Sequence, residues 1–226
     1  MTALSWKFNF ANLTILGHFN PAILRHEFLL RNCKVDLGEL VTTSPPELPL
    51  VSELRYTNIR WFMDLDRMIV ENTDLVKIED FSAPPLAVWY LGILSYTPIR
   101  FAGININSEI LVPDMGVMWK NLSDPWPLND LMRQFEGVSP ELITKSRLVG
   151  DNLIPIETNL SYACPKDAFV RIQFTSAGSD QWVKVNCNWE VRDLEINKSR
   201  LDFINKNYHE VASMMIKLTE AICRED

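Results

Sequence analysis

The stretch Val183-Lys-Val-Asn-Cys-Asn-Trp-Glu-Val191 decides the fold class, because apolar and polar residues alternate along its whole length. Every second residue from Val183 is apolar, and the residues between them are Lys, Asn, Asn and Glu. Successive side chains of a β-strand point to opposite faces of its sheet. The stretch therefore predicts a strand with one buried face and one wet face.

Three further segments with a period of two precede this strand, and turn-forming residues separate them. The segments are Leu142–Val149, Leu153–Ala163 and Ala168–Thr175. Short connections between such strands predict an antiparallel meander of four strands with one wet face. A stripe with helical spacing follows in Leu201–Cys223, and it consists of Ile204, Tyr208, Val211, Met215, Leu218 and Ile222. We expect this long helix to lie across the apolar face of the sheet.

The N-terminal part of the chain mixes predicted strands and helices. The expected elements are a strand Trp6–Leu16, a helix from Asn20-Pro21 to Asn32, a loop Thr42–Pro49, a hairpin of Val51–Arg55 with Ile59–Val70, a buried helix from Ser82 to Pro98, and a strand Ile99–Val112. A further short helix is expected at Leu128–Glu136. Strands and helices that are segregated in this way indicate an α+β fold. We predict a single α+β domain over residues 1–226, with possible pseudo-halves 1–112 and 113–226.

The composition restricts the classes of partner and the compartment. The chain has 226 residues, 22 Lys and Arg against 29 Asp and Glu, and a formal net charge of -7. Nucleic acid binding rests on neutralised phosphates, and Lys and Arg never occur three in a row here, so this class is disfavoured. We expect a cytoplasmic protein with reduced, buried thiols, since an export signal, a membrane-length apolar stretch and paired Cys-x-x-Cys motifs are all missing.

Two carboxylates are the candidates for chemistry. On the expected strand Ile59–Val70, Asp64 and Asp66 would share one face at about 7 Å from each other. Such a pair can hold a divalent metal or act as an acid and a base. The neighbouring Arg60 and Arg67 favour an ordinary solvated strand face instead. We expect no metal and no cofactor, and we keep a metal-dependent hydrolase or nuclease using Asp64 and Asp66 as an alternative.

A Pro-rich stretch, Pro113–Pro127, contains two tryptophans and two methionines. These are Met115, Met118, Trp119 and Trp126. Exposed Trp and Met side chains are frequent in protein-binding surfaces. We therefore expect a loop that binds a protein partner through these four residues. The alternative is that the loop folds back and caps the sheet.

The segment Leu94-Ser-Tyr-Thr-Pro-Ile-Arg-Phe-Ala-Gly-Ile-Asn105 carries a family resemblance. Its Thr-Pro-Ile and Gly-Ile-Asn elements are similar to the signature of a sporadically distributed bacterial family of uncharacterised proteins, which also closes with a helix carrying a His-Glu pair, here His209-Glu210. The resemblance implies a patchy distribution of the kind seen for bacterial defence and toxin–antitoxin loci. It implies no catalytic residues.

These observations favour a non-enzymatic protein-interaction component. It would be an accessory subunit of a bacterial antiviral defence or toxin–antitoxin system, with a partner encoded by neighbouring genes; a homodimer also stays open. A SecB-like chaperone is a further alternative, because an antiparallel sheet backed by a long helix can expose an apolar groove.

Overall fold

The structure, a computed structural model, describes residues 4–33, 37–43, 50–94, 96–123, 141–149, 152–164, 168–176, 181–191 and 198–223. In these ranges, no helix combines the length and the apolar character that crossing a membrane requires. The expected helix Leu128–Glu136 and residue Trp126 lie outside them.

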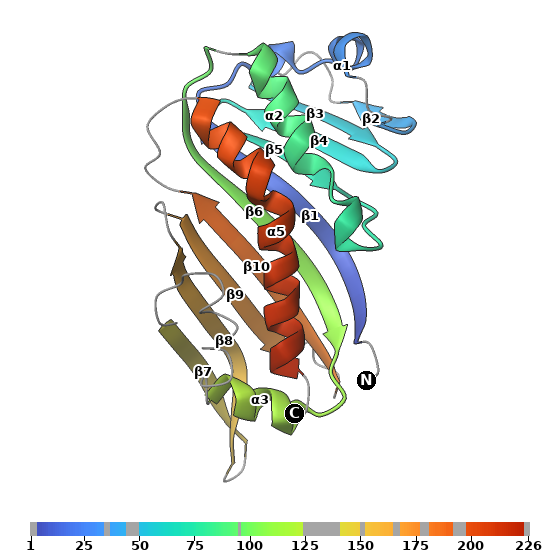
Figure 1. Cartoon of the computed structure of the whole chain (residues 1–226). Helices are drawn as coiled ribbons and strands as arrows, with labels where there is room; N and C mark the ends of the chain where they lie inside the picture. Colours follow the sequence, from blue (N-terminus) through green and yellow to red (C-terminus); the bar gives the residue numbers. More distant parts are fainter. Residues whose placement is uncertain are drawn as a thin grey trace. The chain divides into compact units, whose positions relative to one another are not determined.

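Ten strands and four α-helices make up the described part of the chain (Figure 1). The strands are β1 (Ser5–Gly17), β2 (Leu40–Thr43), β3 (Val51–Tyr56), β4 (Ile59–Asp64), β5 (Arg67–Asn72), β6 (Ile99–Leu111), β7 (Glu141–Val149), β8 (Asn152–Cys164), β9 (Ala168–Ser176) and β10 (Trp182–Val191). The helices are α1 (His26–Asn32), α2 (Ala83–Ile93), α3 (Met115–Ser123) and α5 (Lys198–Cys223), with 3₁₀ turns at Pro21–Ile23 and Ile78–Asp80. The strand order is β2-β3-β4-β5-β1-β6-β10-β9-β8-β7.

The predicted fold class is confirmed. Strands β7 to β10 follow one another in the sheet, and β8 pairs antiparallel with both β7 and β9. Helix α5 extends the predicted C-terminal helix by one turn at its start. The protein is therefore an α+β protein whose antiparallel meander packs against a long C-terminal helix.

The chain divides into two compact units, and each is built from several segments. The first unit contains residues 1–8, 106–190 and 210–226, and the second contains residues 9–105 and 191–209. Strands β1 and β6 and helix α5 contribute residues to both units.

In the first unit, β10 and the second half of α5 form a common core. The four apolar residues of β10 from Val183 to Trp189 are all buried, as their alternation predicts. On α5, Met215, Leu218 and Ile222 are fully buried. The Cys187 Sγ of β10 lies 4.0 Å from the Thr219 Oγ1 of α5, which places the helix directly on the strand.

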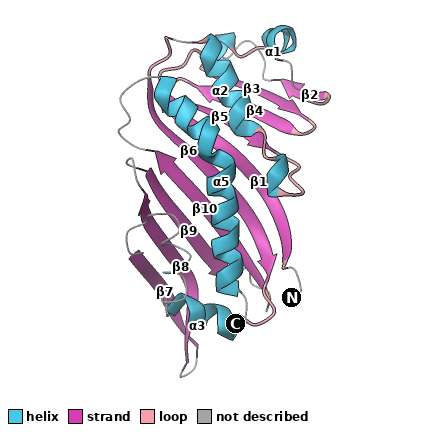
Figure 2. Ribbon diagram, in the orientation of Figure 1, coloured by secondary structure: helices cyan, strands magenta, loops and turns pink. Residues whose placement is uncertain are grey.

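In the second unit, helix α2 covers one face of the sheet (Figure 2). The ring of Tyr90 on α2 packs against that of Trp61 on β4 at 5.3 Å between centroids. Buried apolar residues alternate along the strands on this face, for example Leu13 and Ile15 on β1 and Met68 and Val70 on β5. This alternation leaves the opposite face of the same strands for polar residues.

Three expected boundaries were wrong. The single strand Ile59–Val70 is a hairpin, in which β4 ends at Asp64 and β5 begins at Arg67. Strand β2 occupies the first part of the segment expected to be a loop. The expected helix from Asn20 is a 3₁₀ turn followed by α1, because Leu24 and Arg25 are extended, although the Asn20 side chain does cap the turn by accepting the Ala22 N–H at 3.1 Å.

Candidate functional site

The face of strands β3, β4, β5, β1 and β6 that points away from the buried apolar residues carries a dense set of polar side chains. We call it the open face, and it comprises Asn12, Thr14, Leu16, Glu53, Arg55, Arg60, Phe62, Asp64, Arg67, Ile69, Glu71 and Asn105. All of these residues belong to the second unit. They sit on paired strands, so their positions relative to one another are set by the strand register.

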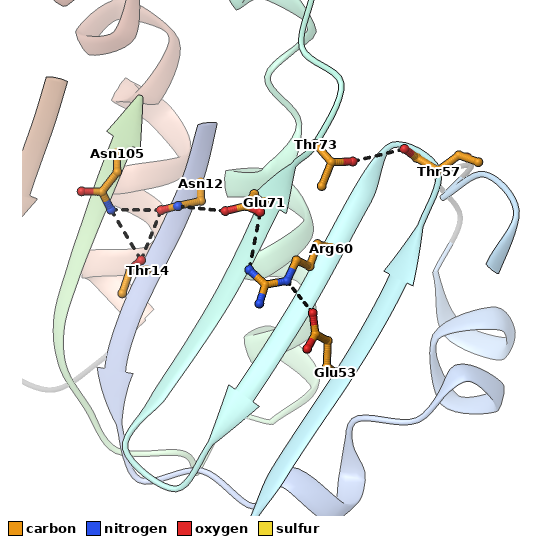
Figure 3. A network of polar contacts seen from close by, with 8 residues as sticks. All are labelled: Asn12, Thr14, Glu53, Thr57, Arg60, Glu71, Thr73 and Asn105. Atoms are coloured by element: carbon orange, nitrogen blue, oxygen red, sulfur yellow. Dashed lines mark hydrogen bonds and ion pairs between the residues drawn. The ribbon is translucent and has the colours of Figure 1, made fainter. Parts of the chain in front are cut away.

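One row of the open face crosses four strands through directly opposed residues. Arg55 of β3 faces Arg60 of β4, Arg60 faces Glu71 of β5, and Glu71 faces Asn12 of β1. Arg60 Nε donates to Glu53 Oε1 at 2.6 Å, and its Nη1 lies 3.6 Å from Glu71 Oε1 (Figure 3). The guanidinium of Arg60 therefore bridges a carboxylate on each neighbouring strand.

The row continues through amide groups onto β6. Asn12 Nδ2 donates to Glu71 Oε2 at 3.3 Å, and Asn12 Oδ1 accepts from Asn105 Nδ2 at 2.9 Å and from Thr14 Oγ1 at 3.2 Å (Figure 3). Asn12 is buried although it is polar, with 7% of its surface exposed. Its amide is satisfied on both sides, which is what a buried polar group requires. Beside the connection between β3 and β4, Thr73 Oγ1, directly after β5, donates to the carbonyl of Thr57 (Figure 3).

Beside this row lies an apolar centre. Phe62 of β4 and Ile69 of β5 face each other directly, and both are half-buried. The guanidinium carbons of Arg60 and Arg67 lie 5.7 and 5.1 Å from the centroid of the Phe62 ring. Each contact of this kind contributes about 0.5–1 kcal/mol at an exposed site. Both arginines therefore contact the aromatic ring, and all three residues lie on the paired strands β4 and β5.

The charges of the open face balance. Three arginines (Arg55, Arg60, Arg67) stand against three carboxylates (Glu53, Asp64, Glu71). Partial burial opposes the ionisation of Arg60, but its hydrogen bond and attraction to Glu53, together with Glu71, raise its pKa above the ordinary value. Arg55 is exposed, and no ion pair joins it to any of the described carboxylates.

The two candidate carboxylates Asp64 and Asp66 do not share a strand face. Asp64 Oδ1 accepts from the backbone N–H groups of Asp66 and Arg67 at 2.9 and 2.8 Å, and its Oδ2 accepts from Arg67 Nε at 2.7 Å. Asp66 lies in the turn and its Oδ1 is 3.8 Å from Arg100 Nη2. Asp64 therefore builds the turn, and no group of three or more metal-ligating side chains exists among the described residues.

The expected loop with exposed Met and Trp was wrong over most of the described part. Residues Met115–Ser123 form helix α3, and Asp114 caps it by accepting the N–H groups of Gly116 and Val117 at 2.7 and 3.2 Å. Met118 is completely buried, so it cannot contact a partner, while Met115 and Trp119 are half-buried.

The sequence analysis named Arg60, Asp64 and Arg67 of the open face, but it did not single out Phe62, Ile69 or the polar row through Glu71, Asn12 and Asn105. The signal was present for Phe62, which follows Arg60 by two residues and therefore shares its strand face. Asn12 and Glu71 are 59 residues apart, and Asn105 is 93 residues from Asn12. Contacts at such separations become visible only when the strand order is known.

Comparisons with known proteins give little further guidance. No protein-family model and no curated protein matches the chain. Among solved structures, the chain is similar to a rolling circle replication initiator protein from Geobacillus stearothermophilus, with 13% identity and a TM-score of 0.33. The similarity covers 94% of this chain and 79% of that protein. At this TM-score it does not bear on function, and the resemblance to the sporadic bacterial family stays a prediction.

Proposed function

We propose that this chain is a non-enzymatic protein-binding component and that it takes a protein partner on the open face. The observation that carries the proposal is Phe62, a ring that Arg60 and Arg67 both contact, with Ile69 beside it. Aromatic and arginine side chains dominate the binding energy of protein interfaces. An apolar centre surrounded by polar groups is the usual anatomy of such a surface.

The charge pattern of the open face favours a protein over a polyanion. Arg60 and Arg67 are already paired with carboxylates, at 2.6 and 2.7 Å. Binding to nucleic acid gains its free energy from cations that are free to neutralise phosphates. On the open face, Arg55 alone meets this condition among the described residues, and the whole chain carries a formal charge of -7.

The two alternative functions receive less support. A hydrolase or nuclease using Asp64 and Asp66 needs carboxylates that converge on a metal, whereas the Asp64 carboxylate accepts three hydrogen bonds within its own turn. A SecB-like chaperone needs an apolar groove beside the long helix. On α5, Ile204, Met215 and Ile222 are buried, so this stripe is used inside the protein.

The biological setting follows from the family resemblance. We propose that the chain acts in the cytoplasm as an accessory subunit of a bacterial antiviral defence or toxin–antitoxin system. The partner would then be encoded next to it. The mixed charge of the open face fits a folded protein with alternating charges at its own surface.

The test is coexpression of the chain with the products of the adjacent genes, followed by affinity measurement on any purified complex. We expect Phe62→Ala to weaken the complex about 30-fold or more, because it removes the aromatic centre. Leu30→Ala is the control, since Leu30 is an exposed apolar residue of α1 outside the open face. If the Phe62→Ala and Arg67→Ala variants both bind the partner with the affinity of the natural chain, the open face is not the binding surface.

A further inference from the structure

Strand β2 forms one end of the strand order, with β3 as its sole neighbour among the described strands. All four of its residues, Leu40 to Thr43, are exposed. A terminal strand presents a row of backbone N–H and C=O groups that another strand can pair with. The pairing with β3 is antiparallel, with a shift at Val41 and regular partners again at Thr42 and Thr43.

This edge carries few of the devices that usually block strand addition. Its sequence is Leu-Val-Thr-Thr, without a charged residue or a proline. Charged side chains, proline and bulges are the common means of protecting an edge, and here the shift at Val41 is the single one present in β2. The apolar side chain of Val41 is 57% exposed at this position.

The edge is nevertheless held firmly in place. The Thr57 N–H donates to the carbonyl of Glu39 at 3.0 Å, just before β2 begins. Gly38 adopts a φ of 78°, and a side chain there would collide with the Thr57 hydroxyl. Only glycine adopts this backbone conformation without strain, so the residues leading into β2 are fixed to the β3–β4 turn.

A free cation lies one strand inside this edge. Thr42 of β2 faces Arg55 of β3 directly, so the two side chains share the open face. Arg55 in turn faces Arg60, and like charges directly opposite each other are unfavourable. Arg60 is compensated by Glu53 and Glu71, whereas Arg55 has no carboxylate partner among the described residues.

We propose that β2 is the docking edge for an extended, acidic segment of a partner protein. The segment adds to the sheet as a strand beside β2, and one of its carboxylates pairs with Arg55 across Thr42. Adjacent strands lie about 4.8 Å apart, so the added strand lies about 10 Å from β3, a distance that the arginine and glutamate side chains together span. Backbone hydrogen bonds supply affinity in this mode of recognition, and side chains supply specificity.

This inference rests on the proposed protein-binding function but uses the β2 edge and the adjoining open-face residue Arg55, not the Phe62 centre. The probe is a capped peptide, Thr-Val-Glu-Val-Glu-Val-Thr, titrated into the ¹⁵N-labelled full chain while backbone amide shifts are followed. Two matched peptides serve as controls: one has Lys in place of both Glu residues, and the other is N-methylated on alternate backbone nitrogens. The shifts are expected at Leu40–Thr43 and Arg55, and the N-methylated peptide is expected to cause none.

Charge reversal tests the pairing with Arg55. We expect Arg55→Glu to lower the affinity for the acidic peptide about three- to tenfold. The Lys peptide should then bind more tightly than the acidic one. Lys184→Glu is the matched control, because Lys184 is an exposed cation on β10. It should leave both affinities unchanged.

Three results would overturn the inference. The first is the absence of shifts at Leu40–Thr43, and the second is an affinity for the acidic peptide that Arg55→Glu does not alter. The third is a dimer in sedimentation experiments that Thr42→Lys dissociates, since the occupant of the edge would then be a second copy of this chain. If the peptide binds at β2 while Phe62→Ala leaves the partner complex intact, the edge assignment holds and the open-face proposal fails.

Discussion

The side-chain oxygen of Asn72 accepts the backbone N–H of Ala83 at 3.0 Å, so the last residue of β5 caps the start of helix α2. The same oxygen accepts the Ser82 N–H at 3.1 Å, and Asn72 Nδ2 donates to Ser82 Oγ at 3.1 Å. Ser82 itself makes no capping hydrogen bond with its side chain. The N–H of Ala83, the first residue of α2, is therefore satisfied by a residue eleven positions earlier in the chain.

Removing the Asn72 cap should destabilise the protein. We expect Asn72→Ala to lower the free energy of unfolding by about 1–3 kcal/mol, because it leaves buried N–H groups without an acceptor. Ser82→Ala removes one of the three hydrogen bonds and should cost less, about 0.5–1 kcal/mol. Urea denaturation of both variants checks the order. A Ser82→Ala variant less stable than Asn72→Ala would contradict the assignment of Asn72 as the cap.

Tyr90 offers the opposite case, a buried hydroxyl that contributes little. It packs against the rings of Phe28, Trp61 and Trp89, and its Oη has no hydrogen-bond partner among the described residues. We expect the free energy of unfolding of Tyr90→Phe to lie within about 1 kcal/mol of that of the natural chain or above it. Tyr90→Ala should lower the free energy of unfolding by about 3–5 kcal/mol, because it leaves a cavity. Thermal and urea denaturation measure both, and a Tyr90→Phe variant as unstable as Tyr90→Ala would show that the hydroxyl is bonded.

Alkaline pH should destabilise the protein through buried groups whose pKa values are raised, and Cys187 and Tyr56 are two of them. Burial raises the pKa of Cys187 from 9.0 to about 12, against a smaller opposite effect of its hydrogen bond with Thr219. Burial also raises the pKa of Tyr56 from 10.0 to about 12, and the charges of Cys33 and Glu27 add to this. The native state keeps both groups protonated, so their stabilising contribution is complete below pH 9 and is lost as the pH rises towards 12.

The measurement is the free energy of unfolding between about pH 8 and pH 11, where it should fall with increasing slope. Cys187→Val and Tyr56→Phe should each make this slope shallower. Tyr96→Phe is the control, because Tyr96 is 97% exposed. Equal slopes for all four proteins would mean that neither buried group is linked to folding.

Asp64 should behave as a turn residue and not as a metal ligand. We expect Asp64→Ala to lower the free energy of unfolding by about 1–2 kcal/mol, because three hydrogen bonds in the β4–β5 turn are lost. Asp64→Asn keeps an acceptor oxygen for the two backbone N–H groups and should cost less. Calorimetry with Mg²⁺ and Mn²⁺ should give no binding heat for the natural chain. A metal-dependent rise in Tm that Asp64→Asn abolishes would reinstate the hydrolase alternative.

Local patterns predicted the meander and the long helix well, because each follows from a single periodicity. Every second residue of β10 is buried from Val183 onward. Of the six residues in the predicted stripe of α5, five are buried and Val211 is half-buried. The sequence missed the β4–β5 hairpin, since Leu65-Asp66 contains no Gly, Pro or Asn. The Asp64 side chain forms this turn instead.

Helix α3 was missed for a related reason. The prolines of the stretch Pro113–Pro127 suggested a loop, but Asp114 directly follows Pro113 and caps the helix. An Asp directly before an apolar run is a helix-start signal, and here the helix forms in spite of the neighbouring proline. The open face was beyond any local pattern, since it joins residues of five strands that the chain brings together from different regions.

The interleaved segments of the two units have a consequence for synthesis on the ribosome. The first unit needs residues 210–226 as well as residues 1–8, and the second needs residues 191–209 as well as residues 9–105. Neither unit can therefore be completed before its own part of α5 has been translated. Until then the core of each unit lacks its C-terminal segment, and apolar surface left exposed in a nascent chain invites chaperones and aggregation. We expect C-terminal truncations before α5 to accumulate as insoluble chains, not as a folded half.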